Sequence, residues 1–364
     1  MGQTAFSELD AGMMRRALAL AEEGLFTTTP NPRVGCVLAR GGTVIAEGWH
    51  ARAGAPHAEA LALAAAGARA RGATAYVTLE PCSHHGRTPP CTEALVAAGV
   101  ARVVAAMRDP NPAAAGGADR LAAAGIRFEH GLMEEAAREL NIGFVSRMVR
   151  GRPWVRLKVA ATLDGRTALA DGTSQWITSA EARADGHRWR ARACALLTGI
   201  GTVKADDPRL TVREVETPRQ PLRVLVDSRL ETPPAARILD GGNLLIFCGV
   251  DDAGRRKALE ARGAQVVVLP NSGGTVDLAA MRVDLAARGV NELHAEGGFK
   301  LNGSLLREGC VDELLVYLNP SLLGDTAQGM FNLPQVESLG ARPRFSLRSV
   351  ERVGEDVRLL ARSA

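Results

Sequence analysis

Strand-like and helix-like segments alternate along most of the chain, and this alternation limits the possible folds more than any other sequence feature. In the first 150 residues, short apolar runs at 34–39, 43–49, 74–79 and 102–107 are typical of strands. An Arg-Gly-Gly turn joins the first two runs and predicts a hairpin. Such alternation predicts a sheet with helices on its faces. The expected helices are 10–23, 57–70 and 91–98, and a further helix and strand are expected around 119–130.

The alternation starts again after a break at residues 149–153, where a glycine loosens the chain and a proline cannot continue a helix. Near-continuous apolar runs separated by helical stretches predict a mostly parallel sheet that is covered on both faces. We therefore expect two α/β domains, residues 1–148 and 149–364. In the second domain the expected strands are 154–161, 193–199, 222–228, 243–249, 264–269, 292–298 and 313–319, and the expected helices are 179–192, 252–262, 277–288 and 299–307.

Composition and charge exclude several classes of protein. The 364 residues are 46% hydrophobic and 23% charged, and the net charge of +4 is nearly balanced in both halves, which argues against sequence-independent nucleic-acid binding. No apolar run approaches the roughly 18 residues of a membrane span, and the N-terminus lacks the apolar core of a signal peptide. Six cysteines are too few for a disulfide scaffold. We expect a cytoplasmic protein that binds neither nucleic acid nor membranes.

Histidine and cysteine gather between residues 36 and 91, where the chain has four His and three Cys. His57 and Glu59 open a predicted helix, Cys82 follows a strand, and Cys91 starts the next helix. One imidazole and two thiolates suit zinc, and a catalytic zinc site keeps its fourth position for water, whose pKa falls to about 7. Glu59 is close enough to move protons without binding the metal. An H-x-E triplet followed by Pro-Cys is the pattern of the zinc deaminases, although here eight residues separate the two cysteines.

Other interpretations of this cluster stay open. A structural zinc site could take His84 or His85 as its fourth ligand. Cys36 lies in an apolar strand, so we expect it in the core. His50 ends a strand and could contact substrate or face solvent.

Two glycine-bearing strand ends in the second half could accommodate a dinucleotide. Residues 198–202 end one strand, and residues 296–298 end another just before a predicted helix. Glycines at a helix N-terminus let backbone N–H groups approach a phosphate, although most such segments are only turns. Arg229 follows a third strand and could meet a 2′-phosphate or face water. A GxGxxG fingerprint after a strand is absent from the sequence.

The motifs of the first half resemble the deaminase domain of the RibD family, the bifunctional deaminase–reductases of riboflavin biosynthesis. The resemblance rests on Asn31-Pro32 with the following Val34–Val37, on His50 before the His57–Glu59 triplet, and on the run 79–91. The wide cysteine spacing with GRTPP inside it separates this family from cytidine and tRNA-adenosine deaminases. The resemblance implies zinc ligands at His57, Cys82 and Cys91, a catalytic proton donor at Glu59, and substrate contacts at Asn31 and His50.

The second half is similar to the reductase domain of the same family, whose fold resembles dihydrofolate reductase and whose cofactor is NADPH. The matching motifs lie at 157–168, 174–179, 206–213 and 296–298, and the tail from residue 325 is left without an assignment. Arg190 and Arg213 could bind a 5′-phosphate bidentately or lie on the surface. The resemblance implies cofactor contacts at Ala160, Trp176, Thr202, Asp206, Ser228, Gly298, Phe299, Lys300, Leu301, Asn302, Gly303 and Ser304, and substrate contacts at Ser174, Arg190, Leu210, Arg213 and Glu296.

The resemblance therefore implies a bifunctional enzyme, with a cytidine-deaminase-like α/β/α domain followed by a dihydrofolate-reductase-like α/β domain. The first would hydrolytically deaminate 2,5-diamino-6-ribosylamino-4(3H)-pyrimidinone 5′-phosphate. The second would reduce the ribosyl group to ribityl with NADPH, with Lys158 or Asp206 as possible proton donors. Its partners would be small phosphorylated pyrimidines, and we expect a homo-oligomer.

Two other functions remain as alternatives. One is a nucleoside or tRNA deaminase fused to an unrelated α/β domain, against which the balanced charge and the GRTPP insert argue. The other is a non-catalytic structural-zinc protein with a dinucleotide-sensing domain. Glu59 argues against that second alternative, because a structural site needs no proton donor.

Overall fold

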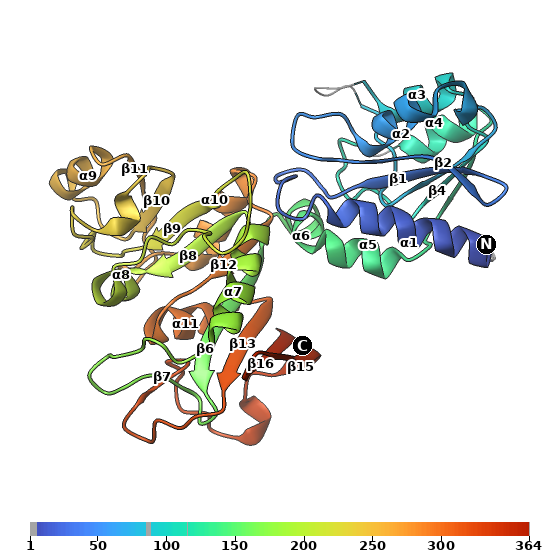
Figure 1. Cartoon of the computed structure of the whole chain (residues 1–364). Coiled ribbons are helices and arrows are strands. Elements are labelled where there is room, and N and C mark those ends of the chain that lie inside the picture. The colour runs from blue at the N-terminus through green and yellow to red at the C-terminus, as the bar shows by residue number, and fades with distance from the viewer. Residues whose placement is uncertain (1–5, 85–88, 115, 364) are drawn as a thin grey trace. The chain divides into compact units, whose positions relative to one another are not determined.

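The computed structural model describes residues 6–84, 89–114 and 116–363, and the chain divides into two compact units, Met1–Gly151 and Arg152–Ala364 (Figure 1). The boundary that we predicted after residue 148 falls inside helix α6 (Ile142–Arg150). That helix continues to Gly151, whose φ of 64° ends it in the left-handed region that favours glycine. Within the described residues, no helix is long and apolar enough to cross a membrane.

The first unit is built on a five-stranded sheet in the order β2-β1-β3-β4-β5. Strand β1 is antiparallel to both of its neighbours, which confirms the predicted hairpin, whereas β3, β4 and β5 are mutually parallel. The strands are β1 (Gly35–Arg40), β2 (Thr43–Trp49), β3 (Thr74–Val77), β4 (Arg102–Ala105) and β5 (Arg127–His130), and the other helices are α1 (Glu8–Glu22), α2 (Ala58–Ala66), α3 (Cys91–Ala97), α4 (Gly117–Ala123) and α5 (Glu134–Leu140).

Alternating side chains of these strands supply two separate cores. Val37 and Val104 face the layer formed by α1, α5 and α6, whereas Leu38 and Val103 face α2, α3 and α4. Helices thus cover both faces of the sheet (Figure 1), as the sequence predicts. The helix expected over 57–70 is shorter, because Gly67 adopts a φ of 55° and ends α2 at Ala66.

Strand β2 and the start of α2 approach each other closely at Gly48. A Cβ atom at this position would lie 2.4 Å from the carbonyl oxygen of Ala58 and 2.8 Å from the backbone nitrogen of Ala62. Only glycine fits there without moving the helix. The contact therefore sets the position of the first turn of α2, which begins directly after His57.

The second unit is built on a nine-stranded sheet in the order β11-β10-β9-β8-β12-β6-β13-β16-β15. The strands from β11 to β13 are parallel, and this confirms the expected mostly parallel sheet. The strands are β6 (Trp154–Thr162), β8 (Ala195–Gly199), β9 (Leu222–Val226), β10 (Leu244–Cys248), β11 (Ala264–Val268), β12 (Glu292–Ala295), β13 (Glu313–Asn319), β15 (Phe345–Val353) and β16 (Asp356–Ser363).

Helices cover both faces of this sheet as well. Leu285 of α10 and Leu305 of α11 pack on one face, whereas Val203 of α8 and Leu259 of α9 pack on the other. A separate two-stranded sheet pairs β7 with β14. The bounds are α7 (Ala180–Arg192), α8 (Ile200–Asp206), α9 (Ala253–Glu260), α10 (Leu278–Ala287), α11 (Phe299–Arg307), β7 (Arg166–Ala168) and β14 (Gln328–Gly329).

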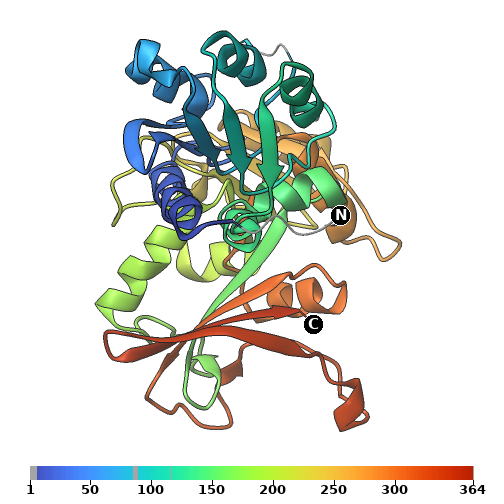
Figure 2. The ribbon, with the colours of Figure 1, turned by 90° about the vertical axis from the view of Figure 1, so that its right-hand side faces the viewer.

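The tail, which the sequence analysis leaves without an assignment, forms the hairpin of β15 and β16 and continues the large sheet in antiparallel fashion (Figure 2). Strand β15 is the edge strand, and Leu347 and Val350 on it are exposed. Its apolar residues are interrupted by arginine, serine and glutamate, so no continuous apolar run marks it in the sequence.

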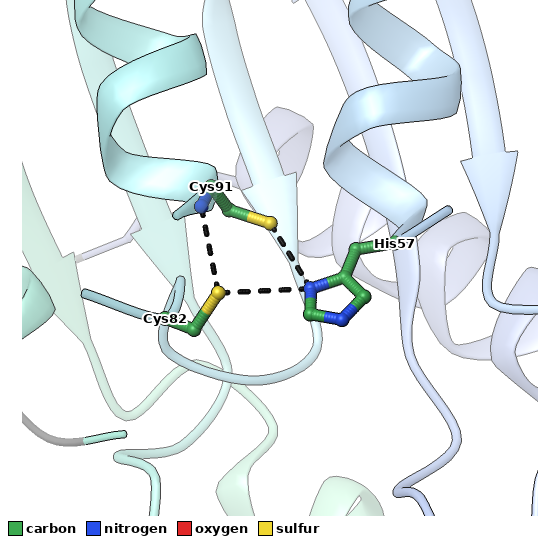
Figure 3. A group of neighbouring side chains, drawn as sticks. All are labelled: His57, Cys82 and Cys91. Carbon is green, nitrogen blue, oxygen red and sulfur yellow. Dashed lines mark hydrogen bonds between the residues drawn. The ribbon is translucent and has the colours of Figure 1, made fainter. Parts of the chain in front are cut away.

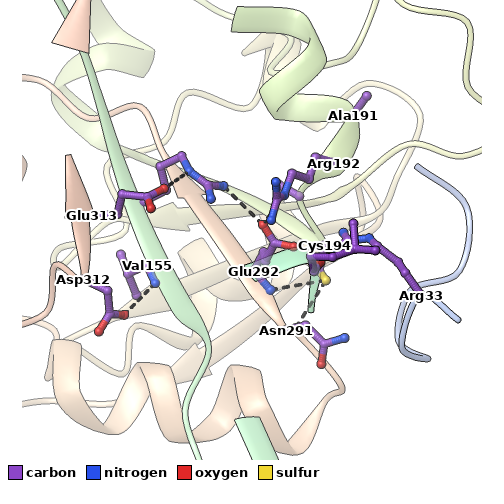
Figure 4. A network of polar contacts seen from close by, with 12 residues as sticks. Arg33, Val155, Ala191, Arg192, Cys194, Asn291, Glu292, Asp312 and Glu313 are labelled. Atoms are coloured by element: carbon purple, nitrogen blue, oxygen red, sulfur yellow. Dashed lines mark hydrogen bonds and ion pairs between the residues drawn. The ribbon is translucent and has the colours of Figure 1, made fainter. Parts of the chain in front are cut away.

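A row of alternating charges crosses the middle of the large sheet. Arg156 of β6 is fully buried and donates to Glu313 on β13 at 2.5 Å and to Glu292 on β12 at 3.2 Å. Arg192 pairs with Glu292 at 2.8 Å (Figure 4), and Arg362 pairs with Glu313 at 2.9 Å. Every buried charge in the row therefore has an opposite neighbour, as burial of charge requires.

We expect Gly48→Ala to weaken both the fold and metal binding in the first unit. The added methyl group must displace α2, which should lower the free energy of unfolding by about 1–3 kcal/mol and shift His57. Denaturant unfolding and competition for zinc with a chelator measure the two effects. Gly12→Ala is the matched control, because its Cβ would lie 3.9 Å from the nearest atom, a side-chain nitrogen of Arg15. Unchanged zinc affinity in Gly48→Ala would show that this contact does not position His57.

Candidate active sites

The predicted zinc ligands of the first unit lie together at one edge of its sheet. His57 directly precedes α2, Cys82 follows β3, and Cys91 is the first residue of α3. The ends of β2 and β3 and the start of β1 meet at this edge, because β1 runs antiparallel to both. The three side chains point toward one another (Figure 3).

The spacing of the three ligand atoms fits a zinc ion. His57 Nδ1 lies 3.2 Å from Cys91 Sγ and 3.6 Å from Cys82 Sγ, and all three atoms lie within 4.8 Å of one another. A tetrahedral zinc, with Zn–S of about 2.3 Å and Zn–N of about 2.0 Å, places nitrogen about 3.5 Å from sulfur. The atoms therefore occupy three corners of such a tetrahedron, with a donor set that zinc favours.

The described residues supply no fourth ligand to this group. His84 is not a member of it, and His85 lies outside the described residues, as do Gly86, Arg87 and Thr88 of the GRTPP insert. Among the described residues, the group therefore has the three ligands that are typical of a catalytic zinc site.

Hydrogen bonds favour the thiolate form at one corner of the site. The Cys91 side chain, the His57 imidazole and the Cys91 backbone N–H all contact Cys82 Sγ and lower the pKa of this thiol to about 4, against the effect of its burial. A thiolate is the form that binds zinc.

Glu59 lies in the first turn of α2, two residues after His57, and only 4% of its surface is exposed. Burial raises the pKa of its carboxyl above the ordinary value, and the charge of His57 opposes this shift. Its side chain contacts the Cys91 thiol but does not belong to the ligand group. A buried carboxyl with a raised pKa beside the metal position is suited to proton transfer.

The structure also brings Asn31 and His50 to this site. His50 Nδ1 lies 3.1 Å from the Pro56 carbonyl oxygen and therefore donates to it, which leaves Nε2 to accept from the Asn31 amide at 3.0 Å. The His50 and His57 rings meet edge-on at 5.4 Å. Burial lowers the pKa of His50, so it is a neutral imidazole in this arrangement.

One nearby carboxyl is missing from our sequence predictions. Asp109 follows the end of β4, and burial together with Glu80, Cys82 and Glu59 raises its pKa to about 6. Its position after a strand parallel to β3 is the signal that could have identified it, because carboxyl ends of parallel strands share one edge.

In the second unit, Arg190 of α7 and Glu296 at the end of β12 form a bidentate ion pair. Arg190 Nη2 donates to Glu296 Oε2 at 2.7 Å, and Nε donates to Oε1. Arg190 Nη1 donates to the Thr211 carbonyl oxygen at 3.1 Å. Although burial opposes it, the charge of Arg190 holds the pKa of Glu296 well below its usual range, so the carboxylate is ionised.

Of the two candidate proton donors, Lys158 belongs to this cluster. Burial and the charge of Arg190 lower its pKa, whereas the charge of Glu296 opposes the shift. Asp206 lies instead at the end of α8, where burial raises its pKa. The site around Glu296 therefore contains a lysine whose proton is held less tightly than usual.

Arg213 lies in a region of concentrated positive charge. Burial lowers its pKa, and so do the charges of Arg190, Arg209 and Arg237, while Glu214 opposes them. Leu210, a predicted substrate contact, is buried three residues earlier with a φ of 50°. Four guanidinium groups that influence one another in this way favour an anionic ligand.

The two glycine turns predicted to accommodate a pyrophosphate are adjacent. A Cβ at Gly199 would lie 3.2 Å from the Leu301 side chain, and a Cβ at Gly298 would lie 3.4 Å from Thr202 Oγ1. Helix α11 begins after Gly298, and no side chain caps it. Its first backbone N–H groups therefore point toward the two glycine turns. Backbone donors beside a glycine cradle fit the phosphates of NADPH.

The other predicted cofactor and substrate contacts are less closely grouped. Trp176, in the loop before α7, is 69% exposed and stacks on Arg183 at 4.6 Å; Ser174 lies in the same loop. Ser228 Oγ accepts from the Val276 backbone at 3.2 Å. Ala160 lies in β6, and Phe299, Lys300, Asn302, Gly303 and Ser304 belong to α11, where a Cβ at Gly303 would meet the Asn332 carbonyl oxygen at 2.1 Å.

Comparison with known proteins covers both units. The family described as "RibD C-terminal domain" matches residues 153–359, and "Cytidine and deoxycytidylate deaminase zinc-binding region" matches 7–107. Riboflavin biosynthesis protein RibD of Escherichia coli is 48% identical over 96% of this chain and 98% of its own, and that of Aquifex aeolicus is 41% identical over 96% and 97%.

Solved structures match over the same extent. The RibD of Acinetobacter baumannii superimposes with a TM-score of 0.90 at 42% identity, covering 98% of this chain and 100% of its own. A Thermotoga maritima protein, described as a diaminohydroxyphosphoribosylaminopyrimidine deaminase/5-amino-6-(5-phosphoribosylamino)uracil reductase, gives 0.88 at 32% identity and covers 98% and 99%. The similarity therefore spans both units in the same order.

Proposed function

The chain belongs to the RibD family of bifunctional riboflavin biosynthesis enzymes, and on this basis we propose which residues carry its two reactions. It has a zinc-binding deaminase domain followed by an NADPH-dependent reductase domain. As substrate of the first reaction we propose 2,5-diamino-6-ribosylamino-4(3H)-pyrimidinone 5′-phosphate, in keeping with the activities ascribed to the Thermotoga relative. The second reaction would reduce the ribosyl group of the deaminated product to ribityl.

The observation that carries the deaminase proposal is the group of His57, Cys82 and Cys91 with a buried carboxyl beside it. These three residues would hold zinc, which when bound supplies a water of lowered pKa as nucleophile. Glu59 would be the proton-transfer group of this reaction, since its buried carboxyl can hold a proton and release it to the amino group that leaves as ammonia. Asn31 and His50 orient the pyrimidine ring through the amide and the neutral imidazole.

In the reductase site, NADPH supplies the hydride when bound, and the chain holds the substrate. Arg190 uses three of its five N–H groups on Glu296 and Thr211, so one hydrogen on each Nη is left to meet a phosphate. Arg213 supplies the second guanidinium of this clamp. Lys158 is the proton donor that we favour over Asp206, because it lies with Glu296 and Arg190.

The findings bear differently on the two alternative functions. An unrelated second domain is excluded, because the RibD C-terminal family matches residues 153–359. Glu59, buried beside the three ligands, has no role in a purely structural zinc site.

We further propose a cytoplasmic homo-oligomer. All six cysteines are free thiols, which suits a reducing compartment. The exposed edge strand β15, which carries Leu347 and Val350, offers unpaired backbone groups of the kind that a second strand can pair with.

We expect Glu59→Gln to retain zinc but to lose most deamination, by about 10²- to 10⁴-fold, because proton transfer is removed and the ligands remain. Metal analysis and ammonia release measure the two properties, and NADPH oxidation on already deaminated substrate should stay near normal. Glu134→Gln, in an exposed ion pair with Arg138, is the control. Loss of zinc would make Glu59 a ligand, and undiminished deamination would remove it from the mechanism.

Arg213→Lys tests the phosphate clamp. A bidentate charged contact contributes about 1.5–3 kcal/mol, so kcat/KM for the phosphorylated substrate should fall about ten- to a hundredfold, because an ammonium cannot reproduce the guanidinium fork. The dephosphorylated substrate and the Kd of NADPH should change little. Arg188→Lys, at an exposed position on α7, is the matched control. A loss confined to NADPH binding would instead assign Arg213 to the cofactor's 2′-phosphate.

We expect the two domains to be independent folding units. Residues 1–151 and 152–364, cut after the end of α6, should each fold when expressed alone. The first should bind zinc and release ammonia, and the second should bind NADPH. Circular dichroism and the two binding assays check this. If both fragments are insoluble while the whole chain is active, each domain needs the other to fold.

A further inference from the structure

The loop at residues 207–221, between α8 and β9, carries Leu210 and Arg213 and is attached to α7 by several side chains. Arg190 holds its Thr211 carbonyl oxygen, as described above. At the other end of the loop, Arg219 Nη2 donates to the Ala191 and Ala193 carbonyl oxygens, both at 3.0 Å. A guanidinium at the C-terminus of a helix satisfies carbonyl groups that have no partner within the helix.

Gln220 fixes the middle of the loop. Its Oε1 accepts from the Val212 backbone N–H at 2.8 Å, and its Nε2 donates to the Val212 carbonyl oxygen at 3.1 Å. One side-chain amide thus pairs with both polar groups of the residue before Arg213. The Val212 side chain is buried, so both its backbone and its side chain hold this residue in place.

His187 holds the next backbone group. It lies in α7 three residues before Arg190, on the same face of the helix, and only 7% of its surface is exposed. Its Nδ1 accepts from the Arg213 backbone N–H at 3.2 Å. One face of α7 thus supplies the Arg190 side chain of the proposed phosphate clamp. The same face holds the Arg213 backbone through His187.

The charges around His187 keep it in the form that can accept this hydrogen bond. Burial lowers its pKa to about 4, the charges of Arg190, Arg213 and Lys158 act in the same direction, and Glu296 opposes them. His187 is therefore a neutral imidazole at any ordinary assay pH. Replacing it with an uncharged side chain leaves the charge of the site unchanged.

By contrast, the Arg213 side chain itself is held only lightly. It is exposed, and its Nη1 donates to Thr211 Oγ1 at 3.2 Å. Its direction therefore depends on how firmly its backbone is fixed. If the backbone were free, ordering it would oppose substrate binding, since the conformational entropy of the segment would be lost in that step.

We propose that His187 is a positioning residue for the reductase substrate, which fixes the Arg213 backbone so that Arg190 and Arg213 form a clamp for the 5′-phosphate before substrate binds. The inference rests on the proposed function, because it requires Arg213 to contact that phosphate. His187 acts through the clamp and not on the ribosyl group. Its loss should therefore affect binding of the phosphorylated substrate and leave the chemical step unchanged.

The test uses the full-length, zinc-loaded enzyme with His187→Leu, which removes the acceptor, and His187→Gln, whose side-chain oxygen can replace it. Loss of one hydrogen bond corresponds to about a five- to tenfold effect. In His187→Leu, we expect the KM for phosphorylated substrate to rise by this factor with kcat unchanged, whereas kcat/KM for the dephosphorylated substrate and the Kd of NADPH stay within about twofold. His187→Gln should recover most of the loss. Thermal unfolding of each variant accompanies the kinetics.

The outcomes separate this inference from the function on which it rests. An equal loss on both substrates, or a fall in kcat alone, would make His187 a general structural or chemical group and overturn the proposal. Wild-type kinetics in His187→Leu would also overturn it, provided that Arg213→Lys lowers kcat/KM for the phosphorylated substrate alone. If Arg213→Lys affects the phosphorylated and dephosphorylated substrates equally, Arg213 does not bind the phosphate, and the inference is wrong as well. Should His187→Leu fail to fold, His187→Ala, a smaller side chain that also lacks the acceptor, decides: a wild-type KM for the phosphorylated substrate in that variant would refute the inference.

Discussion

The direction in which the strands run brings candidate functional residues of each unit to one edge of its sheet. In the first unit, β2, β3 and β4 end at the edge where β1 begins, and this edge receives Asn31, His50, Cys82 and Asp109 together. In the second unit, β8 and β12 are parallel, so Thr202 and Glu296 follow strand ends at one edge. The strand ends of a parallel sheet collect residues that are far apart in sequence, and both sites depend on this geometry.

Burial then decides what each site can do. Burial raises the pKa of the Glu59 carboxyl although the charge of His57 opposes it, whereas the charge of Arg190 lowers the pKa of the buried Glu296. The first carboxyl can therefore carry a proton, and the second remains a fixed negative charge. Removing Arg190 would leave Glu296 buried without a partner, so this arginine cannot be a clean probe of phosphate binding. Arg213 has no such second role in the described structure.

Much of this could be predicted from the sequence, because the strongest signals are local. Short apolar runs predict the parallel strands, and His57, Cys82 and Cys91 each lie close to the end of an element. Three kinds of feature could not be predicted. Helix α8 follows a glycine turn that looks like a loop, and β15 has no continuous apolar run. His187 depends on contacts across the fold and has no local motif, and the one signal for Asp109 is its position after a strand.

The two sites present opposite electrostatic problems. The first gathers two cysteine thiols, Glu59 and Asp109 around His57, a set of acidic side chains that favours a cation. The second gathers Arg190, Arg213 and Lys158 around a single carboxylate, with Arg209 and Arg237 nearby, and so favours an anion. In each case the missing charge belongs to the ligand. A ligand that binds the folded form alone stabilises it, so zinc should stabilise the first unit, and the substrate's phosphate should stabilise the second. Catalytic preorganisation and fold stability are therefore linked through the same charges. The neutral imidazoles of His50 and His187 contact neighbouring groups at the two sites without changing the net charge there.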